Sequence, residues 1–197
     1  MIKFENLLDK ISFTSQDVEK EIMKNDTISI SYRNNKVEWK IRMPSFINSF
    51  YSFCISNQRI PSQQEFLDFY LEENPNFKTF YSKQDSEFRF GVMSRVFRAY
   101  YSLIRDIHMC LSLKDKKDFK VIYNLSADEM LGIDILIEKQ KRMYGFNLFI
   151  NTKNSLEARK KKERRHTINI NTPSFDIPIS FNESKIVIIY TYILINK

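Results

Sequence analysis

The sequence predicts an α/β fold of the α+β kind, with a mostly helical part over residues 1–85 and a mixed central sheet flanked by helices over residues 86–197. In the first part, apolar residues recur every three or four positions, as they do along one face of a helix. After about residue 115 they form short runs rich in β-branched and aromatic residues, which is typical of strands. Because 43% of the 197 residues are hydrophobic, the chain can also bury a core.

The first expected elements are a short helix and a hairpin. Residues 7–11 place leucine and isoleucine at helical spacing. Residues 27–32 and 36–41 alternate between apolar and polar types around Asn34-Asn35, a pair that favours a tight turn. This alternation predicts a small β-hairpin.

Three longer helices are expected next. One follows Pro44, where aromatic and aliphatic residues recur at helical spacing. A second covers residues 63–72: Ser62 and Glu65 predict a capping box at its start, and Asn74-Pro75 ends it. The third and longest runs over residues 86–113 and carries a continuous apolar stripe.

The second part predicts strands with one helix among them. The apolar runs are short and bounded by polar turns. In order, the expected elements are strands Phe119–Tyr123, Gly132–Ile137 and Tyr144–Ile150, helix Ser155–Arg165, and strands Phe175–Phe181 and Ile186–Ile195. This order predicts a mixed sheet with helices packed against it.

The composition excludes several classes of function. With only 3 glycines, the chain has neither GxGxxG nor a P-loop. Cys54 and Cys110 lie in separate apolar runs, which predicts two buried free thiols, without zinc, in a cytoplasmic protein. The only two histidines, His108 and His166, do not support a nucleophilic protease or esterase. The longest apolar run is too short to span a membrane.

Basic charge is concentrated in one segment. The net charge is +7, and residues 153–166 carry seven lysines and arginines but only two glutamates. Such a concentration indicates a polyanionic partner, with a merely solvated helix face as the alternative. The expected nucleic-acid-binding residues share or flank one helix face: Arg159, Lys160, Lys162, Arg165 and His166.

Asp134 is the most informative acidic residue. It lies between Ile133 and Ile135 in an otherwise apolar run, where a carboxylate is costly unless a metal ion or another cation compensates it. The alternative is an ordinary exposed strand position opposite the isoleucines.

The next strand runs into Asn151-Thr152-Lys153. An aspartate in an apolar strand, then a strand that ends in a polar residue, any residue and lysine, resembles the restriction-endonuclease-like, PD-(D/E)xK superfamily. The order of elements over residues 86–195 is similar to its core. The resemblance implies that Asp134 binds Mg²⁺ or Mn²⁺ and that Lys153 positions the attacking water.

This sequence departs from the superfamily pattern at Asn151, which replaces the second acidic residue. An amide oxygen can bind a hard cation but adds no charge. The missing charge could come from Asp128 or Glu129 before the strand, or from Glu87 on the long helix. The site could equally be inactive.

The sequence therefore predicts a metal-dependent nuclease, with DNA ahead of RNA as substrate, in restriction or phage defence. Two alternatives stay open: an inactive nucleic-acid-binding protein on the same fold, and a non-enzymatic interaction protein. Restriction-like nucleases often form dimers to cut two strands. The resemblance therefore also suggests a homodimer.

Overall fold

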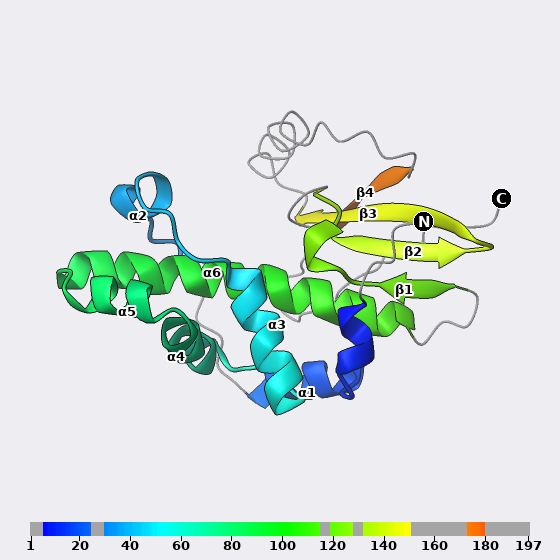
Figure 1. Cartoon of the computed structure of the whole chain (residues 1–197), viewed down its shortest axis with the longest axis horizontal. Coiled ribbons are helices and arrows are strands. Elements are labelled where there is room, and N and C mark those ends of the chain that lie inside the picture. Colours follow the sequence, from blue (N-terminus) through cyan, green and yellow to red (C-terminus); the bar gives the residue numbers. More distant parts are fainter. Residues whose placement is uncertain (1–5, 25–29, 115–118, 128–131, 151–172, 180–197) are drawn as a thin grey trace. The chain divides into compact units, whose positions relative to one another are not determined.

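The chain forms two compact units, described separately below. The structure is a computed structural model, and it describes residues 6–24, 30–114, 119–127, 132–150 and 173–179 (Figure 1). One unit comprises Asn6–Asp115 and is helical; the other includes Lys116–Lys197 and holds the sheet. Over the described residues this is a mixed α+β protein with seven helices and a four-stranded mixed sheet. The units divide after the long helix, whereas the sequence analysis placed the boundary before it.

The helical unit is organised around one long helix, against which most of the shorter helices pack. In chain order the helices are the 3-10 helix η1 (Leu7–Lys10), α1 (Ser15–Lys24), α2 (Asn35–Trp39), α3 (Phe46–Asn57), α4 (Gln63–Glu73), α5 (Pro75–Ser82) and the long α6 (Ser86–Lys114). Helices α1, α2, α3 and α4 all contact α6 (Figure 1). The expected helices after Pro44, over 63–72 and over 86–113 are confirmed.

Short polar signals fix where α4 and α5 begin. The Ser62 hydroxyl accepts a hydrogen bond from the Glu65 amide, and the Glu65 carboxylate accepts one from the Ser62 amide, which confirms the expected capping box. Pro75 does end α4, but it also starts α5, which the sequence analysis missed. Proline suits the first position of a helix because its fixed φ is already helical and no hydrogen-bond donor is lost there.

The core of this unit is aromatic. The rings of Phe50 and Phe66 meet edge to face with centroids 5.5 Å apart, and both side chains are fully buried. The Tyr100 hydroxyl donates to the Pro61 carbonyl at 2.8 Å, and the Tyr70 hydroxyl donates to the Pro44 carbonyl at 3.1 Å. These bonds let two polar hydroxyls be buried with satisfied hydrogen bonds.

The prediction of a hairpin around Asn34-Asn35 is wrong, because residues 35–39 form the short helix α2. The Asn34 side chain accepts hydrogen bonds from the amides of Lys36 and Val37 and so caps the helix. The apolar alternation that suggested a strand instead buries Val37, which is 0% exposed, against α6. A tertiary contact here overrides the local pattern.

The second unit contains a four-stranded sheet in the order β1-β2-β3-β4. The strands are β1 (Lys120–Ile122), β2 (Ile135–Lys139), β3 (Arg142–Ile150) and β4 (Ser174–Ile179). The pairs β1–β2 and β2–β3 are antiparallel, and β3–β4 is parallel. Gln140 and Lys141 close the β2–β3 hairpin with φ angles of 51° and 64°, as a two-residue turn of this hand requires.

A parallel pair needs a crossover between its strands. That crossover falls in residues 151–172, so the expected helix 155–165 lies outside the described residues, as does the expected strand 186–195. The other four expected strands are confirmed, with one shift: β2 begins at Ile135, and Asp134 lies in a bend immediately before it.

Candidate functional site

The chain enters β2 through a tight bend that positions Asp134. Gly132 has a φ of 65°, in the left-handed region where glycine carries no steric penalty. The amide of Ile133 then donates to the Ala127 carbonyl at 3.1 Å. Ile133 packs into an apolar cluster with Ile122, Ala127 and Leu136. The bend is therefore held on both sides of Asp134.

The Asp134 carboxylate lies against the backbone of β3. Its Oδ2 accepts a hydrogen bond from the Leu148 amide at 2.6 Å, and the residue is only 9% exposed. The regular pairing of β2 with β3 ends at Ile135 and Phe146. The hydrogen bond from the Leu148 amide to the Asp134 side chain therefore continues the contact between the two segments beyond the last backbone pair. The burial contradicts the alternative of an exposed strand position. A carboxylate so placed needs donors or a cation around it.

Continuing the β2–β3 register by one pair sets Asp134 opposite Asn147. Asn147 is 3% exposed, and its Nδ2 donates to Asp176 Oδ1 at 3.2 Å on the neighbouring strand β4. Asn147 and Asp176 are direct partners in the parallel register, so they share one face. Asp134 immediately before β2, Asn147 on β3 and Asp176 on β4 thus form a row of polar residues, the polar row.

The polar row contains one atom whose bonding is incomplete. Among the described residues, none donates a hydrogen bond to the buried Asn147 Oδ1. Buried side-chain oxygens in native proteins almost always have a donor, a water or an ion as partner. The Asn147 amide has its nitrogen turned to Asp176, so the atom left without a donor among the described residues is its carbonyl oxygen, which can accept from a water or bind a cation.

The polar row can supply oxygen ligands of the kind that Mg²⁺ prefers: two carboxylates and an amide carbonyl. It does not form a complete metal site by itself. Within the described ranges, no three histidine, cysteine, aspartate or glutamate side chains gather as a metal-binding group. A metal ion at the polar row would take its remaining ligands from water, from a phosphate or from other parts of the chain.

Most of the site residues expected from the sequence lie outside the described residues. These are Asp128 and Glu129 before β2, Asn151 and Lys153 after β3, and the basic residues Arg159, Lys160, Lys162, Arg165 and His166. Glu87 is described: it belongs to α6 in the helical unit, where its Oε1 accepts a hydrogen bond from the Tyr32 hydroxyl at 3.1 Å.

Sequence reasoning missed Asn147 and Asp176. The available signal was a single polar residue inside each of two apolar strands, the same signal that drew attention to Asp134. The pairing of Asn147 with Asp176 depends on the register of two strands separated by a long crossover. A sequence pattern does not specify that register.

Other titratable groups in the helical unit have structural partners. The Nε2 of His108 lies 2.8 Å from Glu19 Oε1, and Arg105 pairs with Asp106 at 2.6 Å. Cys54 and Cys110 are both buried, as predicted, and no disulfide joins them. Burial raises the pKa of the Cys54 thiol well above its usual range, so this sulfur is a poor nucleophile.

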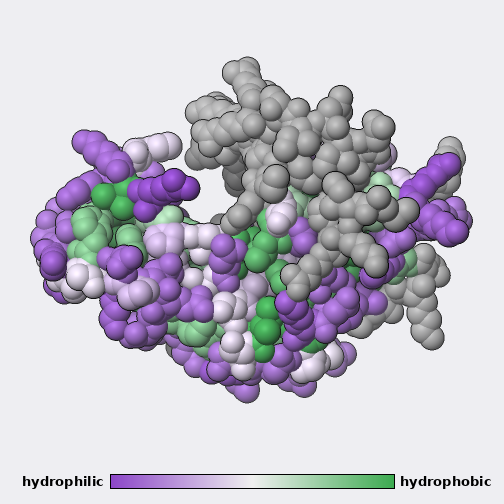
Figure 2. Space-filling view, viewed as in Figure 1, coloured by the Kyte–Doolittle hydropathy of each residue, from purple (hydrophilic) through white to green (hydrophobic). Residues whose placement is uncertain are grey.

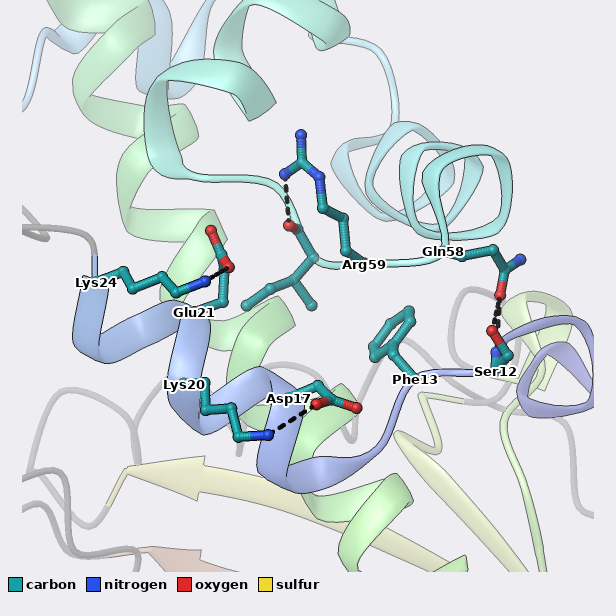
Figure 3. Close-up of a pocket in the computed structure, with 9 residues that line it drawn as sticks. Ser12, Phe13, Asp17, Lys20, Glu21, Lys24, Gln58 and Arg59 are labelled. Atoms are coloured by element: carbon teal, nitrogen blue, oxygen red, sulfur yellow. Dashed lines mark hydrogen bonds and ion pairs between the residues drawn. The ribbon is translucent and has the colours of Figure 1, made fainter.

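The helical unit also has a polar hollow of about 400 Å³ between α1 and the segment that joins α3 to α4 (Figure 3). Its cations already have carboxylate partners: Lys20 lies 3.4 Å from Asp17, and Lys24 lies 3.6 Å from Glu21. Both oxygen and nitrogen of the Gln58 side chain are hydrogen-bonded. The side chains that line the hollow bind mainly one another, so it carries no catalytic proposal.

Comparison with known proteins yields no relative: neither protein-family models, nor curated proteins, nor solved structures match this chain. A search of the described helices for a span that is both long enough and apolar enough to cross a bilayer also found none.

Proposed function

We propose that this protein is a metal-dependent nuclease that hydrolyses phosphodiester bonds, with Asp134 as its first metal ligand. The observation that carries the proposal is the polar row, where a buried carboxylate lies in register with a buried amide oxygen that has no donor among the described residues. Oxygen atoms of this kind, at the start of β2 and in the second half of β3, suit a hard divalent cation such as Mg²⁺ or Mn²⁺.

The topology of the sheet supports the same proposal. Three antiparallel strands are followed by a fourth strand parallel to the third. The long helix followed by three strands and, after a crossover, a fourth is similar to the order of elements in the restriction-endonuclease-like core, in which an aspartate of an apolar strand binds the metal. Because no family or structural match accompanies it, the likeness rests on topology and on the position of Asp134.

In this proposal Asp134 and Asn147 would hold the metal ion, with Asp176 orienting the Asn147 amide. A bound divalent cation stabilises charge on the scissile phosphate and lowers the pKa of the attacking water. Lys153 would position that water, and the basic segment 153–166 would bind the nucleic-acid backbone, which carries the negative charge that Lys and Arg neutralise.

A second function is favoured by one specific observation: the residue opposite Asp134 in the extended register is an amide, and so is the residue at the second acidic position of the sequence motif. Asn147 lies opposite it, and Asn151 occupies the second acidic position of the motif. One carboxylate with two amides binds Mg²⁺ less tightly than two or three carboxylates do. The second candidate is therefore a protein of the same fold that binds nucleic acid without cutting it.

The experiment is a cleavage assay on the whole chain with labelled plasmid DNA and labelled RNA, in Mg²⁺, Mn²⁺ or a chelator. Asp134→Asn keeps the size of the side chain and removes its charge. Glu138→Gln, four residues later on β2, is the matched control. Metal-dependent cleavage that Asp134→Asn abolishes and Glu138→Gln retains supports the nuclease.

The other outcomes separate the alternatives. Salt-sensitive binding with no cleavage in either metal favours the second candidate. Cleavage that persists in Asp134→Asn at an unchanged rate contradicts the assignment of Asp134. If the chain neither binds nor cleaves nucleic acid, both candidates fall.

A further inference from the structure

The helical unit presents its one tryptophan to solvent. Trp39, the single tryptophan of the chain, is 83% exposed, while Val37, two positions earlier on the same helix, is fully buried. Residues two apart on a helix point in nearly opposite directions. The buried side of α2 therefore faces α6, and the indole projects away from it. An indole this exposed leaves a large apolar surface in water, which proteins normally avoid.

The helix that carries Trp39 is firmly attached. Arg95 donates to the Val37 carbonyl, and Arg98 donates both to the Tyr32 carbonyl and to the Glu38 carboxylate. Gly91 of α6 lets the two segments approach closely, because a Cβ at that position would lie 2.5 Å from the Cβ of Asn34. The exposed indole therefore lies on a helix that hydrogen bonds and close packing fix to α6.

Positively charged side chains surround α2. Arg33, Lys36, Lys40 and Arg42 are all exposed, and within the described part of the chain no carboxylate forms an ion pair with any of them. Glu38 is already engaged by Arg95 and Arg98. Burial, together with repulsion from Arg33 and Arg95, lowers the pKa of Arg98, as expected for crowded positive charge. Around α2, hydrophilic side chains lie beside a small hydrophobic patch (Figure 2).

We propose that Trp39 and the basic residues around it form a binding site for single-stranded nucleic acid, with an unpaired base stacked on the indole and phosphates bound by Arg33, Lys40 and Arg42. A base in a duplex has both faces covered by its neighbours, so an exposed indole selects an unpaired one. The charged surroundings favour this ligand over a protein, whose contact would need apolar residues around the tryptophan.

This site lies in the helical unit and is separate from the polar row. It shares with the proposed function only the class of ligand. Binding is therefore measured with a chelator present, so that cleavage plays no part. If Asp134→Asn loses cleavage but still binds single strands through Trp39, this inference stands. If the chain cleaves nucleic acid without binding it through Trp39, the nuclease proposal stands.

The test uses the indole fluorescence of the whole chain, excited at wavelengths that the 10 tyrosines do not absorb, so that the signal reports on Trp39 alone. Titration with a short oligothymidylate should quench this fluorescence, because stacking on a base brings the indole into contact with it. Trp39→Ala should weaken binding by about 5- to 100-fold in an anisotropy assay with labelled oligonucleotide, and Trp39→Phe should weaken it less. Met23→Ala, at an equally exposed apolar residue of α1, should change nothing.

The basic residues are tested separately, through the salt dependence of binding. Arg42→Gln should reduce the slope of log affinity against log salt concentration by about 0.7, the value for one phosphate contact to a single strand. Equal affinity of Trp39→Ala and the unaltered chain would overturn the proposal. So would tighter binding to the matching duplex, or equal quenching by polyglutamate, which would assign the surface to an acidic protein.

Discussion

Replacing Asp134 with alanine tests whether its carboxylate holds β2 and β3 together. The change removes the acceptor for the Leu148 amide and leaves that buried N–H without a partner. A hydrogen bond to a charged group contributes about 1.5–3 kcal/mol, so we expect local destabilisation of about 2 kcal/mol. Asp134→Asn keeps one acceptor oxygen and should lose less.

Amide hydrogen exchange at Leu148, followed by NMR, is the most local assay. A loss of about 2 kcal/mol corresponds to exchange that is about 30-fold faster if this amide opens by local unfolding. The Phe50 amide in the helical unit is the internal reference and should not change. Equal protection of Leu148 in Asp134→Ala and in the unaltered chain would refute the structural role of this carboxylate.

Three further predictions concern the helical unit. Hydrogen bonds from Arg59 and Ser62 hold the pKa of Glu65 at about 2. The ionised Glu65 therefore stabilises the fold above the ordinary carboxylate pKa, and this stabilisation is lost as the pH falls through about 2. Acid unfolding should depend less on pH in Glu65→Gln than in the unaltered chain. Gly91→Ala should push α2 away from α6 and raise the accessibility of Val37, measured as faster exchange of its amide. Cys54 should react with a thiol reagent only after denaturant is added, because burial raises its pKa and excludes the reagent; rapid reaction in native buffer would contradict its burial.

The parts of the fold that follow from local sequence were predictable. The capping box at Ser62 and Glu65 and the stripe along α6 depend on residues a few positions apart, and both are confirmed. α2 was mistaken for half of a hairpin because its buried residue, Val37, packs against α6, which is distant in sequence. Alternation over five residues does not distinguish a strand from one turn of helix packed on another element.

The candidate site could be predicted only in part. Asp134 was recognisable from its charge within an apolar run, but its partner on β3 was not. The sequence motif directed attention to Asn151, whereas the register sets Asn147 opposite Asp134. Asp176 joins the same row only through the parallel pairing of β3 and β4, two strands that are distant in sequence.

The most direct test of the central claim is anomalous diffraction from crystals of the chain grown with Mn²⁺, which replaces Mg²⁺ and can be located by its scattering. We predict a peak at the polar row, within about 2.0–2.6 Å of an Asp134 carboxylate oxygen and of Asn147 Oδ1, as for hard cations bound by oxygen. A water molecule alone at Asn147 Oδ1 in the presence of millimolar Mn²⁺, with no anomalous signal near Asp134, would contradict a metal site in this protein.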